Sequence, residues 1–414
     1  MSIRVTPPVE RGLALAAIAV VCLSAPASAQ SRQLELGLEG FGYESTASAI
    51  NRDNVLGLDR YPGLGRFAVG WKETHGGFRA VFRGYVERTW GERENETSWV
   101  VRQGYAQYWW GEKLGLRVGK QRIAWGSGLA WNPTNRLEPA KNALNTSLEQ
   151  EGALAARLDW APVSRASVVA VVASTDASPR DLPVASDTRR RDTAALRARL
   201  VVKDTDLAVV ASGGRNQRTL FGLDIGRDAA GVATLHAEAA VYRGAELLPA
   251  RDARTFFRLV AGALRTSGED ALALEYFFNA EGYSDTGARL WLAGLDQAWA
   301  AASSPSLPPA ARQRALASYG AAASIPYGWG LGLRRHYLHA SWTRGGATSA
   351  WTWAVRTVVG LSDGAVAFTP GIGYAPRGNV TLNLDAVLLL GPDDSEYRLA
   401  PVRGALQARL KLLF

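Results

Sequence analysis

The sequence contains very little cysteine, methionine or histidine. Its 414 residues include one cysteine, one methionine and four histidines. Cys22 is the one cysteine, and it lies near the N-terminus. The sequence therefore excludes an internal disulfide. His336 and His339 would point to opposite faces of a strand, and His75 and His236 are isolated, which is a poor arrangement for binding one metal ion. We therefore expect no metal site, no cofactor, no catalytic residue and no enzymatic activity.

Long apolar runs are also missing. Beyond the first 23 residues, no stretch reaches the roughly 18 uncharged apolar residues of a membrane-spanning helix, and the mean hydropathy is only −0.08. The formal charge of +9 is spread along the chain. No nucleic-acid-binding motif accompanies it, so we expect no nucleic-acid partner. By contrast, glycine (43 residues), tryptophan (14) and tyrosine (13) are plentiful, as in membrane β-barrels, whose strands are half apolar and whose aromatic residues gather at the two interfaces.

The N-terminus has the pattern of a secretory signal peptide. Arg4 and Arg11 provide the positive region, residues 12–23 form a short apolar segment, and Ala27-Ser28-Ala29 is a small-residue cleavage site. We expect cleavage after Ala29, which leaves residues 30–414 as a single domain without cysteine.

The C-terminal strand is the most informative segment. From Arg403 to Phe414, small or apolar residues alternate with residues that include Arg403, Arg409 and Lys411. This period of two is expected of a strand with lipid outside and water inside. Ending on Phe414, the strand resembles the assembly signal of Gram-negative outer-membrane β-barrels. That resemblance implies location in the cell outer membrane, with the barrel assembly machinery and outer-membrane lipid as partners.

Alternation along the whole chain predicts an all-β, antiparallel transmembrane barrel of about eighteen strands. The expected strands are 33–43, 64–73, 77–88, 97–110, 113–121, 151–160, 165–174, 193–203, 205–213, 218–226, 231–242, 255–266, 270–282, 331–343, 347–360, 364–375, 378–390 and 402–414. Short Gly/Asp-rich turns alternate with mostly longer links, the pattern of periplasmic turns and outer loops. Sixteen strands is the alternative, if the pair near 205–226 is misassigned.

The link 122–150 is the best candidate for shaping a pore. In general porins the loop after the fifth strand folds inward, and this chain resembles that arrangement. The segment from Arg117 to Gly126 also resembles alginate-export-like barrels. Residues expected to line the constriction are Trp125, Trp131, Asn132, Asn135, Arg136, Glu138, Lys141 and Asn142. The alternative is a loop packed over the rim, with its tryptophans as interface anchors.

Strand register predicts which charges face the lumen. The expected inward cations are Arg79, Arg83, Arg117, Arg197, Arg199, Arg258, Arg356, Arg403, Arg409, Lys113, Lys203 and Lys411. The expected inward acids are Glu35, Glu39, Glu87, Glu238, Glu275, Glu281 and Asp385. This excess of cations predicts a mildly positive interior that favours anions. At the closing seam, Arg403, Arg409 and Lys411 should lie beside Glu35 and Glu39. The alternative is that the charges pair with one another along the wall.

The longest link, 283–330, contains two helix-compatible stretches, 288–302 and 310–319, separated by prolines. They could form a lid or partner-binding element, or a cap packed on the barrel mouth. Together these patterns predict a porin-like channel for passive diffusion of small polar solutes, anionic or neutral. The alternatives are a component of an export or lipid-trafficking system, or a non-conducting structural barrel. An oligomer is possible, and the sequence leaves the solute open.

Overall fold

A computed structural model describes residues 31–414, apart from 56, 92–94, 139–140, 145, 147–150, 177–189, 216, 245–253, 324–331 and 346–348. The expected signal peptide lies outside the described residues. So do parts of the predicted loops 122–150 and 283–330.

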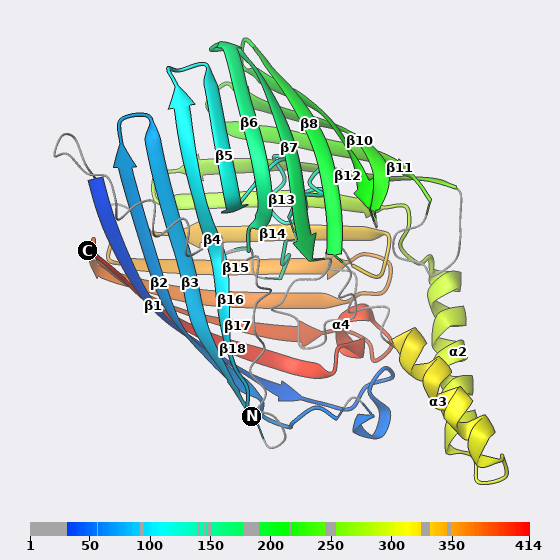
Figure 1. Cartoon of the computed structure of the whole chain (residues 1–414). Coiled ribbons are helices and arrows are strands. Elements are labelled where there is room, and N and C mark those ends of the chain that lie inside the picture. The colour runs from blue at the N-terminus through cyan, green and yellow to red at the C-terminus, as the bar shows by residue number, and fades with distance from the viewer. Residues whose placement is uncertain are drawn as a thin grey trace.

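The chain forms one closed sheet of eighteen antiparallel strands (Figure 1). Each strand pairs with its neighbours in the chain, and β1 also pairs with β18 to close the ring. The strands are β1 (Ser31–Ser45), β2 (Gly63–His75), β3 (Phe78–Trp90), β4 (Thr97–Trp110), β5 (Leu114–Gln121), β6 (Ala153–Val163), β7 (Ala166–Asp176), β8 (Arg190–Val202), β9 (Thr205–Arg215), β10 (Gln217–Ala229), β11 (Ala233–Arg243), β12 (Thr255–Ser267), β13 (Asp270–Asn279), β14 (His336–Arg344), β15 (Trp351–Gly360), β16 (Val366–Arg377), β17 (Val380–Leu390) and β18 (Val402–Leu413).

The prediction of eighteen strands is therefore confirmed, and the sixteen-strand alternative is wrong. The main differences are at three strand ends. β13 ends at Asn279 rather than at residue 282, β14 begins at His336 rather than at 331, and β15 begins at Trp351 rather than at 347. The chain leaves β13 early because residues 280–284 form a turn that leads into a helix.

The alternating sequence gives most strands an apolar outer face and a more polar inner one. On β17, for example, Leu382, Leu384 and Leu388 are exposed on the outside of the ring, whereas Asp385 is buried inside it. A strand in a sheet places successive side chains on opposite faces, so leucines on one face and an acid on the other fit lipid outside and a polar interior.

The two ends of the barrel differ in their links. At one end, here called the turn end, short turns such as residues 76–77 and 111–113 join the strands, and the C-terminal residue Phe414 also lies there. At the other end, the loop end, the links include 46–62, 122–152 and 280–335. Exposed aromatic residues mark both ends. Those near the turn end are Tyr108, Trp110, Trp160, Trp351 and Trp353, and those near the loop end are Trp90, Trp99, Phe221 and Phe257.

Helices lie at the loop end (Figure 1). They are the 3-10 turn η1 (Arg52–Asn54), α2 (Asp285–Ser303), α3 (Pro309–Ala323) and the short α4 (Glu396–Leu399). The two helices predicted in the longest link are confirmed as α2 and α3, whereas η1 and α4 were not predicted. Among the described helices, none combines the length and the apolar character that crossing a bilayer requires.

The α2–α3 hairpin is packed against neighbouring loops. The Tyr319 hydroxyl donates to the carbonyl oxygen of Ala49 at 2.9 Å, and Arg52 forms an ion pair with Asp296. Leu295 and Tyr319 are buried with Ile50 and Leu399, which belong to two other links. Two alternatives were given for this segment, a lid or partner-binding element and a cap packed on the barrel mouth. These contacts agree with the cap.

The seam between β1 and β18 matches the predicted charges only in part. Lys411 Nζ lies 3.0 Å from Glu35, as expected. Arg409 is the register partner of Glu39 but instead forms an ion pair with Asp385 of β17 at 2.9 Å. Glu39 pairs with Arg66 of β2 and Arg102 of β4, so Arg409 and Glu39 lie side by side as predicted but form their ion pairs with other side chains. Arg403 lies near Glu44 and Ser45 rather than beside Glu35 or Glu39.

Closure of the ring can be tested by cross-linking. Leu38 and Leu410 are register partners in a hydrogen-bonded pair, for which the Cα atoms are about 5.5 Å apart, within the range that a disulfide spans. We predict that the variant Leu38→Cys/Leu410→Cys, with Cys22 removed, forms a disulfide on oxidation and migrates as a closed form on denaturing gels. The matched control, Leu38→Cys/Leu412→Cys, is two residues out of register and should cross-link poorly. Equal cross-linking of both pairs would contradict this register.

Candidate functional site

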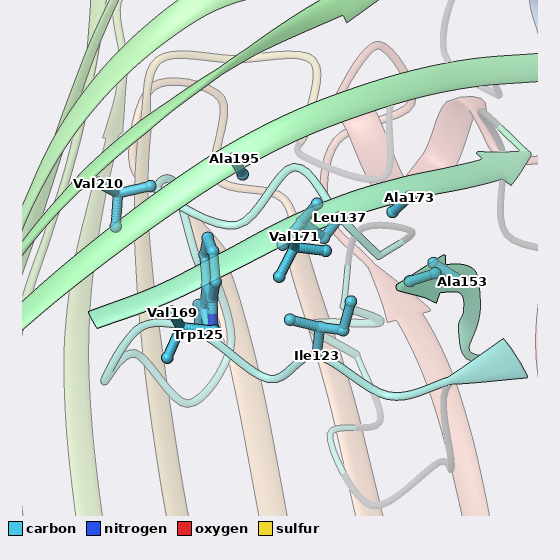
Figure 2. Packing of buried hydrophobic residues seen from close by; sticks show 10 residues of the cluster. Ile123, Trp125, Leu137, Ala153, Val169, Val171, Ala173, Ala195 and Val210 are labelled. Carbon is cyan, nitrogen blue, oxygen red and sulfur yellow. The ribbon is translucent and has the colours of Figure 1, made fainter. Parts of the chain in front are cut away.

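The link between β5 and β6 begins by packing on the inner side of the wall. Ile123, Trp125 and Leu137 are buried against small apolar side chains of four successive strands (Figure 2). Those side chains are Ala153, Ala155, Val169, Val171, Ala173, Ala195 and Val210, from β6, β7, β8 and β9. This patch is an apolar seat for the loop, because burial of these methyl groups and the indole ring is favourable wherever water would otherwise cover them.

Glu238, in the middle of β11, binds the next part of the loop. Its carboxylate accepts hydrogen bonds from the backbone N–H of Gly128 at 2.6 Å, the Asn132 amide at 2.9 Å and the Thr134 hydroxyl at 2.9 Å. Nearby, the Ser127 hydroxyl donates to Asp224 of β10 at 2.6 Å. Glu238 is fully buried. Its negative charge is therefore stabilised by donors that the loop supplies.

Glu275, in the middle of β13, also binds the loop through its carboxylate. It accepts hydrogen bonds from the backbone N–H groups of Leu129 and Ala130, the second at 2.7 Å. His236 Nε2 lies 2.6 Å from the same carboxylate. Glu238 and Glu275 together are called the loop anchors below. Because they bind mainly backbone groups, they fix the path of the loop more than the identity of its side chains.

Trp131 completes the contact with the far wall. Its ring stacks on Phe277 of β13, with centroids 4.9 Å apart and an interplanar angle of 13°, and it also contacts Tyr337 and His339 of β14. Further along, Thr369 of β16 donates to the carbonyl oxygen of Leu144 at 2.8 Å. Aromatic pairs of this kind add about 0.5–1.5 kcal/mol beyond simple burial.

These contacts put the loop inside the barrel. The loop starts at the end of β5, and β14 is half-way round the ring of eighteen strands from there. At the end of the link, Glu151 lies 3.5 Å from Lys120 of β5 and accepts a hydrogen bond from Tyr85 of β3. A segment that touches inward side chains on opposite sides of a closed ring, at mid-strand, must pass through its interior.

The eight residues predicted to form a constriction have different surroundings. Trp125 and Trp131 are buried against opposite walls, and Glu138 is buried between Ile123 N–H and Arg122. The other five remain partly exposed. Asn132 binds Glu238, and Asn135 donates to the Ile123 carbonyl. Arg136 stacks over Tyr242 at 5.3 Å, Lys141 donates to the Gly128 carbonyl at 2.6 Å, and Asn142 accepts a hydrogen bond from Leu144 N–H at 3.0 Å. Most of these polar groups thus hold the loop in shape.

Cations are concentrated on one side of the interior. β2 to β6 carry Arg66, Arg79, Arg83, Arg102, Arg117, Lys120 and Arg157. By contrast, β9 to β13 carry Asp206, Asp224, Glu238 and Glu275, and Glu281 lies just beyond the end of β13. Arg117 and Arg157 are register partners, and Arg79 and Arg117 both pair with Gln107, so three arginines lie in one row. Charge of opposite sign on facing walls creates a transverse field across the interior.

Many wall charges also pair locally. Glu39 lies 3.6 Å from Arg66 and 3.2 Å from Arg102. Further ion pairs are Arg83–Glu35 at 3.3 Å, Arg197–Asp224 at 3.3 Å, Arg199–Asp206 at 2.6 Å, Arg356–Asp385 at 3.1 Å and Arg258–Glu281 at 3.2 Å. Arg403 is exposed at the start of β18. Lys113 and Lys203 were expected in the wall but lie in turns at the turn end, just outside β5 and β8.

Neither the loop anchors nor the apolar patch beneath the loop was recognised from the sequence. Glu238 and Glu275 were expected as wall charges, with no role in holding the loop. One sequence signal was available: residues 168–173 of β7 are all Val or Ala, whereas a strand with one polar face should alternate. An unbroken apolar run indicates a strand covered on both faces, here by lipid outside and by the loop inside.

A second cluster, around Glu396, joins three links at the loop end with the start of β14. Its carboxylate accepts a hydrogen bond from Leu333 N–H at 2.9 Å and from the Tyr337 hydroxyl. Asp363 accepts from Glu396 N–H at 2.9 Å and pairs with Arg334 at 3.1 Å. Burial raises the pKa of Glu396 to about 7, and the nearby Asp363 carboxylate adds to that rise.

The loop anchors should control how firmly the loop is held. Removing both carboxylates, in Glu238→Ala/Glu275→Ala, leaves several buried backbone donors unsatisfied at roughly 1–3 kcal/mol each. We predict a marked loss of hydrogen–deuterium exchange protection at residues 127–134. Asp385→Ala is the matched control, because it removes a buried wall carboxylate whose ion-pair partners, Arg356 and Arg409, belong to the wall. Unchanged protection in the double variant would refute the anchoring role.

The Glu396 cluster should open more easily as the pH rises. Because its pKa is raised in the folded state, the folded cluster binds the proton more tightly than the opened one. Below the ordinary pKa of a glutamate, Glu396 is protonated in both the folded and the opened cluster, so the cluster loses no stability. As the pH rises from about 4.5 to above 7, the cluster loses stability on the order of 3 kcal/mol. Exchange protection of residues 391–401, corrected for intrinsic rates, should fall over this range in the native chain and stay level in Glu396→Gln. The same pH dependence in both would exclude Glu396 as the cause.

Comparison with known proteins shows similarity at the level of structure. No protein-family model matches the chain, and no curated protein matches it. Among solved structures, OccAB1 of Acinetobacter baumannii has a TM-score of 0.55 at 11% identity, covering 93% of this chain and 96% of that one. OprD of Pseudomonas aeruginosa has a TM-score of 0.53 at 11% identity, with 93% of each chain covered. OpdK of Pseudomonas aeruginosa, solved with vanillate, has a TM-score of 0.53 at 10% identity, covering 93% of this chain and 98% of that one. The chain therefore shares the barrel fold of these outer-membrane proteins.

Proposed function

We propose that this protein is a porin-like channel of the outer membrane, through which small polar solutes diffuse passively. The observation that carries the proposal is the inward loop, held at mid-height by Glu238 and Glu275 within a ring of eighteen strands. Barrels of this size enclose an aqueous lumen rather than a packed core. A loop fixed across such a lumen narrows it without filling it, which is the arrangement of a selective diffusion pore.

Location in the outer membrane is supported by several features together. The exposed faces are apolar, and aromatic residues lie near both strand ends, as at the two interfaces of membrane barrels. The expected signal peptide, residues 1–29, fits export to this membrane. The turn end then faces the periplasm, and the loop end, with its helical cap, faces outward. The structural likeness to outer-membrane proteins such as OprD fits this location.

The mechanism we infer is filtration by size and by charge. Residues 122–150 form the constriction. The members of the predicted set that keep exposed surface are Asn132, Asn135, Arg136, Lys141 and Asn142. The row Arg79, Arg117 and Arg157 faces the acidic wall across the interior. A field of this kind orders water and orients polar solutes. The cationic row favours anionic or neutral solutes.

The resemblance of residues 117–126 to alginate-export-like barrels keeps a second function open. In that case the barrel would be the outer-membrane component of an export or lipid-trafficking system. A third possibility is a structural barrel that does not conduct. Both are distinguished from a diffusion pore by their conductance, because neither requires a steadily open path for ions.

Conductance of the purified protein in a planar bilayer tests the proposal. We predict steady open channels with a preference for anions. Arg79→Glu/Arg83→Glu/Arg117→Glu should shift that preference toward cations, because it reverses the charge of the basic wall. Arg289→Glu/Arg312→Glu/Arg314→Glu changes the net charge equally on the helical cap and should leave the preference nearly unchanged. A silent barrel would overturn the channel function, and equal shifts in both triple variants would overturn the wall assignment.

A further inference from the structure

The link 391–401, between β17 and β18, contacts the inward loop through one apolar cluster. Trp131 of the loop is buried in that cluster beside Tyr337 of β14. Tyr397 and Ala400 of the link pack against the same cluster. A link at the mouth of the barrel and the loop across its lumen therefore share a set of side chains, although they follow different strands.

Tyr337 also connects this apolar cluster to the carboxylate of Glu396. Its ring centroid lies 6.0 Å from that of Trp131, and its hydroxyl donates to Glu396. The same hydroxyl accepts a hydrogen bond from the N–H of Arg334. Gly332, with a φ of +90°, lies so close that a Cβ there would be 2.5 Å from the Tyr337 hydroxyl oxygen. Tyr337 is thus enclosed by the Glu396 cluster at its hydroxyl and by the loop at its ring.

The charges around Glu396 make its ionisation unfavourable. Arg334 lies 3.1 Å from Asp363 and 3.7 Å from Asp285, so two carboxylates already share this guanidinium. Asp363 also accepts the N–H of Glu396 at 2.9 Å, which sets the two acids side by side. An ionised Glu396 therefore adds a like charge at short range. Among the described residues, the titratable and charged groups that face Glu396 are Arg334, Asp363, Tyr337 and, on its own helix, Tyr397.

The start of the loop is held at a different place. Ile123, Trp125 and Leu137 pack in a separate apolar cluster on β6 to β9, whereas Trp131 belongs to the cluster that the link 391–401 contacts. Disruption of the Glu396 cluster therefore loosens the loop at Trp131 and leaves it attached at Trp125.

We propose that the Glu396 cluster regulates the constriction, and that ionisation of Glu396 loosens the packing of Trp131 and widens the path through the barrel. This inference rests on the channel function proposed above and adds its regulation. Burial raises the pKa of Glu396 to about 7. The stability that the protonated group contributes is lost as the pH rises through that value. The path is accordingly narrower in mildly acidic medium and wider in mildly alkaline medium.

Hydrogen–deuterium exchange of the full-length protein tests the coupling between the link and the loop. Exchange is measured at about pH 5 and about pH 8 and corrected for intrinsic rates, so that it reports local opening. In the native chain, the protection of residues 129–134 should fall at least about tenfold over this range. Residues 123–125 should stay level, because they belong to the other attachment.

The variant Glu396→Gln isolates the cause of this response. Its amide is neutral, like the protonated acid, so residues 129–134 should stay protected at both pH values. Asp393→Asn is the matched control, because Asp393 is an exposed acid of the same link that pairs with Arg398. It changes the charge equally and should keep the native response. His339, which contacts Trp131, is present in all three proteins, so any response that it causes appears equally in each.

Channel recordings in a planar bilayer provide the functional readout. We expect the native conductance to be roughly twofold larger at the higher pH, because a wider path passes more ions. This ratio should approach one in Glu396→Gln and stay at the native value in Asp393→Asn.

Three results would overturn the inference: level protection of residues 129–134 in the native chain, the native response in Glu396→Gln, or loss of the response in Asp393→Asn. Failure here is distinct from failure of the channel function. A conducting barrel whose loop does not respond to pH rejects only the regulation. A silent barrel whose loop still responds through Glu396 rejects only the channel.

Discussion

The arrangement of the interior depends on two buried carboxylates that bind the backbone of a loop. Glu238 and Glu275 are fully buried, and donors from residues 128–134 satisfy much of their hydrogen-bonding capacity. Neither carboxylate would be stable there without the loop, because an unpaired buried charge is costly. The loop in turn would lack a fixed path without the carboxylates. This mutual dependence keeps a flexible link across a wide barrel in one place.

The position of the loop matters because the wall around it is unevenly charged. The loop lies between a basic wall on β2–β6 and an acidic wall on β9–β13, and its anchors belong to the acidic one. Backbone N–H groups stabilise part of that acidic wall. In the row of Arg79, Arg117 and Arg157, an ion pair joins Arg157 to Asp159. Because the loop covers part of the acidic wall, the arginines have the larger electrostatic effect on solutes in the lumen.

The sequence was sufficient for the fold because each strand carries its own period-two pattern. Leu382, Leu384 and Asp385, for example, determine which face of β17 meets lipid. Long-range contacts between side chains could not be predicted in this way. Arg409 binds Asp385 rather than its register partner Glu39, and Glu275 binds Ala130, 145 residues away. Such pairs depend on strand stagger and on the path of the loop, which alternation does not encode.

The most direct test of the account is the size of the open path. In a planar bilayer, neutral polymers of graded size reduce ion conductance only when they are small enough to enter the pore. If the loop narrows the lumen, the native channel should exclude polymers that enter a variant lacking residues 130–142. A native channel that admits the same polymers as this deletion variant would contradict the account, because the loop would then lie outside the path of the solute.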